Sequence, residues 1–231
     1  YLCQDAALEG DPQNHWAGNH NPHLAAMLES IDDGVGRILT KLKSLNLDQN
    51  TIVIFTSDNG GETKVTSNAP LRGGKSQLYE GGIRVPLIVS WPDAISPSRV
   101  STHPTSNVDF YPTLLEAAKI TANGQQPLDG ISLLNTWKHP DVSPKRRALF
   151  WHYPLEKPHF LGGVSSGAIR LSNWKLIENF TNNSIELYNI PKDPSESVNL
   201  AKKKPTLSKS LLNELIAWRK LIGATKNPPK R

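Results

Sequence analysis

The clearest periodic pattern in the sequence is a run of apolar residues at helical spacing that begins just after Asn21 and Pro22. Asn21 is a favourable N-cap, and Pro22 suits the first position of a helix. Apolar residues then recur every three or four positions, as on one face of an amphipathic helix. They are Leu24, Met27, Leu28, Ile31, Val35, Ile38, Leu39, Leu42 and Leu45. We therefore predict one long helix whose apolar stripe packs against another element.

A short β-branched run from Thr51 to Ser57 follows a polar break at residues 48–50. Its apolar residues are successive, which is typical of a strand that is buried on both faces. A second strand is expected from Ile83 to Ser90, at an edge or irregular position because Pro86 has no amide hydrogen. Pro112 is expected to open another helix. A helix, a short turn and a buried strand together indicate an α/β layered sheet.

The pattern changes near residues 140–145, where short alternating segments begin. These segments predict antiparallel strands, and an amphipathic helix follows them from about Thr206 to Leu221. The strands are expected at Ala148 to Tyr153, Gly167 to Ile177 and Ser184 to Ile190. We therefore predict two domains: residues 1–143 form part of an α/β domain, and residues 144–231 form a small α+β subdomain with a packing helix and a basic tail.

Composition narrows the class of protein. With 37% hydrophobic and 20% charged residues, 18 prolines and 16 glycines, the chain has the composition of a loop-rich globular protein. No apolar run approaches the roughly 20 residues of a membrane span, so no membrane span is expected. The net charge of +5 comes from the segment after Leu200, where nine Lys or Arg face the single Glu214. We interpret this segment as a solvated tail and expect no nucleic-acid partner. Cys3 is the only cysteine, which excludes an internal disulfide.

Candidate chemistry begins where the first predicted strand ends. Asp58 and Asn59 follow that strand directly and precede Gly60 and Gly61. Functional sites of open α/β sheets gather beyond the carboxyl ends of strands, and Asp and Asn offer the oxygen ligands that Ca²⁺ or Mg²⁺ takes. The alternative is an ordinary Asp-Asn-Gly turn, because these residues are common turn formers.

A second candidate is the glycine-rich loop that contains Arg72, Gly73, Gly74 and Lys75. Paired glycines let the backbone approach a ligand closely, and a lysine beside them can meet an anion as a point charge. A flexible surface loop with solvated cations is the alternative. Since this loop follows the Asp-Asn pair so closely, we favour an anion bound beside a metal ion.

These stretches, taken together and in order, resemble the type I sulfatases of the alkaline-phosphatase-like superfamily. The resemblance is carried by Thr51 to Gly61, Thr66 to Lys75, Tyr79 to Pro86, Trp91-Pro92, Asp109 to Leu115, Ala168 to Arg170, Trp174 to Ile177 and Glu186 to Asn189. It implies a partial alkaline-phosphatase-like layered sheet, with residues 1–143 as the C-terminal part of the catalytic domain. Residues 144–231 would then be the sulfatase C-terminal subdomain.

The resemblance also implies the roles of the candidate residues. Asp58 and Asn59 become ligands of an active-site Ca²⁺, and Lys75 becomes a contact to the sulfate or to its leaving oxygen. Arg72 is placed with Lys75 among the substrate-binding residues, although it is expected mainly to brace the loop. The implied activity is calcium-dependent hydrolysis of a sulfate ester on a small molecule or a glycan. Members of this family are periplasmic, secreted or lysosomal.

Other motif residues receive structural expectations. Glu80 and Arg84 are expected to brace the glycine-rich loop, and Asp109 to cap the helix that Pro112 opens. Trp174 and Lys175 are expected to pack within the sheet of the subdomain.

One family motif does not occur in this sequence. The family converts a Cys or Ser, followed at fixed spacing by Pro and Arg, to the formylglycine nucleophile. Cys3 lacks that context, and at Pro97-Ser98-Arg99 the converted position is occupied by Ile95. We therefore expect the nucleophile segment to lie outside this chain and the chain by itself to be inactive. Two alternatives are a phosphohydrolase of the same superfamily and a non-catalytic module that binds sulfated glycans through Arg72, Lys75 and the basic tail.

Overall fold

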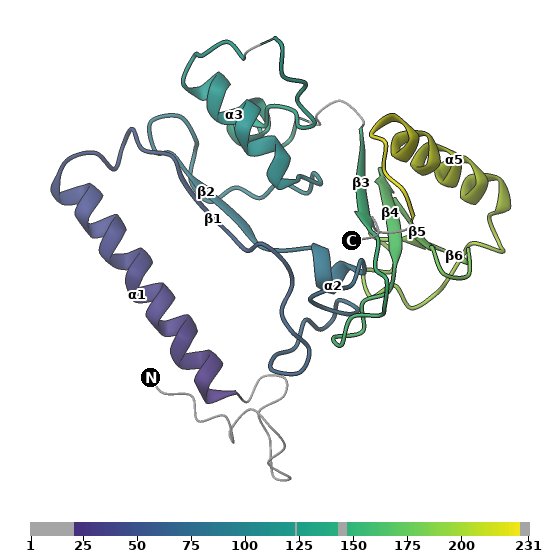
Figure 1. Cartoon of the computed structure of the whole chain (residues 1–231). Helices are drawn as coiled ribbons and strands as arrows, with labels where there is room; N and C mark the ends of the chain where they lie inside the picture. The colour runs from purple at the N-terminus through teal and green to yellow at the C-terminus, as the bar shows by residue number, and fades with distance from the viewer. Residues whose placement is uncertain (1–20, 123, 143–146, 227–231) are drawn as a thin grey trace. The chain divides into compact units, whose positions relative to one another are not determined.

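The structure is a computed structural model that describes residues 21–122, 124–142 and 147–226 (Figure 1). Cys3 and the end of the basic tail lie outside the described residues. The chain divides into two compact units. The first contains the chain up to Gly36, Thr56–Pro86 and Ala148–Arg231, and the second contains Arg37–Phe55 and Leu87–Arg147. The domain boundary between residues 143 and 144 stays a prediction.

Helix α1 spans Pro22–Ser44, as the apolar periodicity predicts. The Asn21 side chain caps it, because Asn21 Oδ1 accepts hydrogen bonds from the backbone N–H groups of His23 and Leu24 at 3.1 and 3.0 Å. The expected packing of its apolar stripe is not observed within the described residues. No residue of α1 is buried, and Ile31 is 52% exposed. None of the helices in the described part of the chain combines the length and apolar character of a membrane span.

Strands β1 (Val53–Thr56) and β2 (Leu87–Ser90) form a two-stranded sheet. The expectation that β1 is buried on both faces is wrong, because in the described residues only β2 pairs with it and Phe55 is 42% exposed. The second strand also begins later than expected. Its predicted first residue, Ile83, is instead the last residue of the short helix α2 (Glu80–Ile83). The helix ends with a hydrogen bond from the Arg84 N–H to the Glu80 carbonyl at 2.7 Å.

The second unit contains the helical turn η2 (Asn107–Asp109), α3 (Phe110–Ala117) and α4 (Leu134–Lys138). The expected capping of α3 by the Asp109 side chain is wrong, because Asp109 stands at the N-cap of α3 but its side chain makes no cap hydrogen bond there. Its Oδ2 instead accepts the Ser106 N–H at 2.8 Å in the capping box of η2. Its Oδ1 accepts the Ile131 N–H at 3.0 Å, and Arg147 forms an ion pair with it. The helix begins at Phe110 and not at Pro112, because the capping box already closes the preceding turn.

The first unit contains a four-stranded antiparallel sheet with the strand order β3, β4, β5, β6. The strands are Ala148–Tyr153, Ser166–Leu171, Trp174–Asn179 and Ile185–Asn189. The single strand expected from Gly167 to Ile177 is therefore a hairpin. Ser172, with φ 52°, adopts the left-handed conformation that reverses the chain between β4 and β5.

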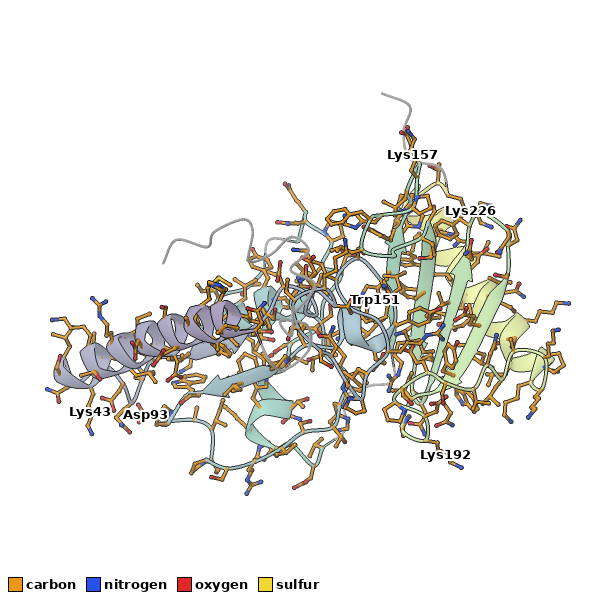
Figure 2. The ribbon with its side chains drawn as sticks, turned by 90° about the horizontal axis from the view of Figure 1, so that it is seen from below. Lys43, Asp93, Trp151, Lys157, Lys192 and Lys226 are labelled. Atoms are coloured by element: carbon orange, nitrogen blue, oxygen red, sulfur yellow. The ribbon has the colours of Figure 1, made fainter. Side chains whose placement is uncertain are left out.

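Both faces of this sheet are covered. Helix α5 (Pro205–Leu221), predicted from about Thr206, lies along one face (Figure 1). That face buries Ile169, Leu176, Leu187, Leu211 and Leu215. The other face buries Ala168, Ile177, Tyr188 and Ile190, and the side chains that pack on it are Leu78, Tyr79 and Trp151 of β3, which Figure 2 labels. Side chains alternate between the faces along each strand, as the period of two requires.

Lys175 of β5 points toward the second face and is completely buried. Its ammonium group lies 3.0 Å from Glu80 Oε1 and 2.9 Å from Glu196 Oε1. Glu196 Oε2 also accepts the backbone N–H of Glu80 at 2.6 Å, and Arg170 lies 3.7 Å from Glu80 Oε2. The bracing expected of Glu80 is thus confirmed, whereas Lys175 is an ion-pair partner as well as a packing residue. This group of charges attaches α2 to the sheet.

We predict that Lys175→Met lowers the free energy of unfolding by about 3–5 kcal/mol, because it leaves two buried carboxylates without their common partner. Urea denaturation followed by circular dichroism measures the change. Lys192→Met is the matched control, since Lys192 is exposed and labelled in Figure 2. Equal denaturation midpoints for the two variants would contradict a stabilising role of the buried ion pairs.

Candidate active site

Asp58 and Asn59 form a tight turn immediately after β1. The Asn59 N–H donates to Asp58 Oδ1 at 2.9 Å, and the Ser57 hydroxyl donates to the Asn59 carbonyl at 2.8 Å. Asp58 is exposed and Asn59 is half-buried. Asp58 Oδ2 and Asn59 Oδ1 receive no hydrogen bond from the described residues. Two oxygen atoms of adjacent side chains are therefore available to a ligand.

The backbone of the glycine-rich loop interlocks with this turn. The Gly60 N–H donates to the Gly82 carbonyl at 2.9 Å, and the Lys75 N–H donates to the Gly61 carbonyl at 3.1 Å. A Cβ atom on Gly60 would lie 1.7 Å from the Gly81 carbonyl oxygen, so only glycine permits this approach. The structure thus brings Lys75 to the Asp58 and Asn59 turn, as the sequence analysis expects.

Asn68 holds the two loops together, and sequence reasoning missed it. Its Oδ1 accepts the Gly61 N–H at 2.9 Å, while its Nδ2 donates to the carbonyls of Gly61 and Gly73 at 2.8 and 3.1 Å. One amide side chain therefore satisfies three backbone groups on both sides of the site. The only signal in the sequence is its position within the stretch from Thr66 to Lys75, since an isolated Asn carries no distinctive chemistry.

Lys75 is exposed at a strained segment of the loop. Gly73 before it and Ser76 after it have φ values of 73° and 74°, and this left-handed conformation is unfavourable for Ser76. Strain of this kind stores about 1–3 kcal/mol and is typical of functional loops. The Lys75 ammonium group has no ion pair or hydrogen bond with the described residues. The loop therefore presents a cation without neutralising it.

Arg72, in contrast, points toward the sheet. Its Nη1 donates to the Tyr188 hydroxyl and the Glu196 carbonyl, both at 3.0 Å, and its guanidinium lies 3.9 Å from the centre of the Tyr79 ring. These contacts confirm the bracing role. Its additional role as a substrate contact stays a prediction.

Two tyrosines complete the attachment of Arg72. The hydroxyl groups of Tyr79 and Tyr188 both donate to Glu186 Oε2, at 2.9 and 2.7 Å. Burial, together with the Glu186 carboxylate, raises the pKa of Tyr79 to about 12 and raises that of Tyr188 as well. Both hydroxyls therefore remain protonated donors at neutral pH.

Glu196 is the other residue that sequence reasoning missed. It is completely buried and adopts the left-handed conformation with φ 50°. Burial raises the pKa of its carboxyl, although Lys175 acts in the opposite direction. Its contact with the Glu80 N–H joins residues that are 116 positions apart in the chain. No local pattern signals such a contact.

The residues present fit part of a Ca²⁺ site. Asp58 and Asn59 supply the hard oxygen atoms that Ca²⁺ prefers, and Ca²⁺ normally takes 6–8 of them. Within residues 21–122, 124–142 and 147–226, no group of three or more His, Cys, Asp and Glu side chains is arranged to hold a metal ion. This chain can therefore provide one side of such a site.

Comparisons with known proteins match most of this chain. A family model described as sulfatase matches residues 5–120, and one described as the C-terminal region of N-sulphoglucosamine sulphohydrolase matches residues 74–220. A sulfatase from Formosa agariphila is 36% identical over 216 residues, covering 84% of this chain and 39% of that protein. Mouse arylsulfatase J is 30% identical over an alignment of 245 positions, which covers 89% of this chain and 41% of that protein.

A solved structure supports the fold. It contains a protein in complex with its substrate, D-glucosamine-2-N,6-O-disulfate, and is 27% identical to this chain with a TM-score of 0.74. The similarity covers 94% of this chain and 44% of the solved one, so the chain spans less than half the length of each of these relatives. The predicted partial alkaline-phosphatase-like α/β fold is thereby confirmed. On its sequence and on its fold, the chain belongs to the sulfatase family.

Proposed function

We propose that the protein hydrolyses sulfate esters in a Ca²⁺-dependent reaction to which this chain contributes Asp58, Asn59 and Lys75. The observation that supports this most strongly is the hydrogen bond from the Lys75 N–H to the Gly61 carbonyl. It joins the backbone of Lys75 to the glycine pair that directly follows Asp58 and Asn59, and the Lys75 cation forms no ion pair with the described residues. A sulfate group needs both Lys75 and the metal ion, because its oxygen atoms carry negative charge and its leaving oxygen gains charge during cleavage.

Each residue has a defined part in this proposal. The Asp58 carboxylate and the Asn59 amide oxygen hold one side of a Ca²⁺ ion. When bound, this ion would neutralise charge on the sulfate oxygen atoms. The Lys75 ammonium contacts the sulfate or its leaving oxygen and stabilises the charge that develops there.

The substrate in this proposal is a sulfated small molecule or glycan. A relative of similar fold binds a sulfated glucosamine as its substrate. Arg72 is proposed as a secondary substrate contact, because 43% of its side chain remains exposed in spite of its contacts with the sheet.

We predict that Asp58→Ala and Asn59→Ala lower both the calcium content and the turnover of a protein that also carries the family's nucleophile segment. Each substitution removes a hard oxygen ligand from a site that needs several. Metal analysis after dialysis measures the calcium content. Asp93→Ala is the control, since Asp93 is an exposed turn residue labelled in Figure 2. Unchanged calcium content in both site variants would refute the ligand assignment.

We predict that Lys75→Ala reduces turnover of the same protein by about 10²–10³, the effect of losing one donor to a developing anion. Lys75→Arg should recover only part of this loss, because a planar guanidinium replaces a compact charge poorly. Steady-state kinetics with an aryl sulfate measures both variants, and Lys43→Ala serves as the control for loss of an exposed cation. Near-normal kcat/KM in Lys75→Ala would make Lys75 a bystander.

We predict that the 231-residue chain by itself does not hydrolyse an aryl sulfate, even with added Ca²⁺. No Cys or Ser stands in the sequence context for conversion to formylglycine, and Asp58 and Asn59 supply a minority of the Ca²⁺ ligands. The chain is assayed beside a version that is extended to carry the nucleophile segment and is matured by a formylglycine-generating enzyme. Comparable turnover by the two proteins would show that a different nucleophile acts.

A further inference from the structure

A hollow of about 320 Å³ lies at the end of the four-stranded sheet where β5 begins and β6 ends. Trp174 and Leu200 line it and also pack against the apolar core between the sheet and α5. Leu78 and Tyr79, which follow the glycine-rich loop, pack on the opposite face of the sheet. The hollow and the glycine-rich loop therefore lie on opposite faces of the same sheet.

Hydrogen bonds fix the walls of this hollow. The Leu200 N–H donates to the Leu187 carbonyl at 2.8 Å, which attaches one wall to β6. The Lys204 N–H donates to the Leu200 carbonyl at 3.0 Å and so continues this wall toward α5. On the other side, Asp193 Oδ2 accepts the Val198 N–H at 2.9 Å. The hollow is thus formed in advance of any ligand, as small binding sites usually are.

The opening of the hollow is positively charged. Lys192 and Lys204 line it and form no ion pair with the described residues, and Figure 2 shows Lys192 extending from this end of the sheet. Lys204 also ends a run of three exposed lysines that begins at Lys202. Among the described lining residues the only carboxylate is Asp193, and both of its oxygen atoms accept hydrogen bonds from residues 195–198 of its own loop. The opening therefore favours an anionic ligand.

One acceptor and one donor in the lining have no partner. Asn189 Oδ1 is buried and receives no hydrogen bond from the described residues, which is unfavourable for a buried acceptor. The N–H of the half-buried Trp174 indole likewise has no acceptor among the described residues, although such a group usually finds one. Trp174 and Asn189 are directly paired across β5 and β6, so their side chains are neighbours. A ligand that offers both an N–H and a carbonyl group would satisfy the two together.

The apolar surface that remains open in the hollow is aliphatic. The Lys204 ammonium group lies 5.4 Å from the centre of the Trp174 ring, so a cation already covers one face of the indole. Val198 and Leu200 supply the other apolar lining, and Val198 is 51% exposed. The hollow therefore suits an aliphatic side chain better than a sugar or another ring that must stack on the indole.

We propose that the hollow binds an acidic peptide segment of a partner protein. One aliphatic side chain of the segment packs on Val198 and Leu200, and Asp or Glu side chains beside it pair with Lys192 and Lys204. This inference concerns the face of the sheet opposite the glycine-rich loop and does not depend on the proposed sulfatase function.

The backbone of the segment completes the match. Its N–H donates to Asn189 Oδ1, and a neighbouring carbonyl accepts the indole N–H of Trp174. A peptide carries the aliphatic side chain, the carboxylates and both backbone groups in one short stretch, which an isolated anion does not.

The test is fluorescence anisotropy of the 231-residue chain with a fluorescein-labelled peptide of sequence Asp-Glu-Leu-Asp-Glu. Two control peptides carry the same label. One has Ser in place of Leu, and the other has Asn and Gln in place of Asp and Glu. Both should bind at least about tenfold more weakly, because one lacks the apolar side chain and the other lacks the charges.

Variants of the chain locate the binding. Lys204→Glu should weaken binding of the Leu-containing peptide about three- to tenfold, because it reverses one charge at the opening. Lys220→Glu is the matched control, since it makes the same charge change on an exposed residue at the other end of α5 and should leave the affinity unchanged. Val198→Asp should weaken binding about tenfold or more by placing a like charge on the apolar wall. Circular dichroism verifies that each variant is folded.

Asn189→Leu separates binding from folding. It removes the buried acceptor, so it should weaken peptide binding without lowering the urea denaturation midpoint.

No binding of the Leu-containing peptide by wild type would overturn the proposal. Equal affinities for the Leu and Ser peptides would also overturn it, because attraction would then rest on charge alone. Tighter binding of a sulfated polysaccharide that Val198→Asp weakens would identify a glycan site and would overturn the peptide assignment.

Discussion

The buried contact of Lys175 with Glu80 and Glu196 is the interaction on which the candidate site depends. A lysine and two glutamates without solvent carry a large desolvation penalty, which close pairing and additional hydrogen bonds must offset. Here the second cation Arg170 and the backbone N–H of Glu80 contribute those further contacts. The arrangement has a single geometry, because each carboxylate has its charged partner within 3.0 Å of one oxygen. A packed apolar pair would not specify the position of α2 in this way.

The position of α2 is transmitted to the site by backbone contacts. Gly81 and Gly82 follow Glu80 directly, and they receive and donate the hydrogen bonds that lock Gly60 and Arg72 in place. Because no side chains intervene between α2 and the turn at Asp58, the backbones of Gly60 and Gly81 approach closely. A loop that the sequence describes as glycine-rich is therefore ordered. This order holds the backbone of Lys75 in place and leaves its ammonium group without an ion-pair partner in the described residues. Both features favour binding of an anion.

The same contacts give the C-terminal sheet a role in supporting the candidate site. Thr56–Pro86 belongs to the compact unit that contains this sheet, and the family model for the C-terminal region begins at residue 74. The first of these observations groups the glycine-rich loop with the sheet, while both family models overlap the loop. The sheet is thus a support for the candidate site on one side, through Glu80 and Arg72.

The sequence by itself determined the features that arise from near neighbours. The capped start of α1 at Asn21, the period of α5 and the alternation of the antiparallel strands all depend on residues within about four positions of one another. The pairing of Asp58 with Asn59 at a strand end, and the lysine after two glycines, are equally local. For that reason, the candidate residues and the family could be identified from the sequence.

Only the tertiary structure decided which distant residues meet. Lys175 is 95 positions from Glu80, and its identity as an ion-pair partner depends on the register of β5 and on the packing of α2. The three hydrogen bonds of Asn68 and the left-handed Glu196 follow from loop geometry that no local period encodes. The hairpin turn at Ser172 and the exposure of β1 were missed for the same reason. A hydrophobic pattern indicates which face of a segment can be buried. Which element covers that face depends on the packing of the rest of the fold.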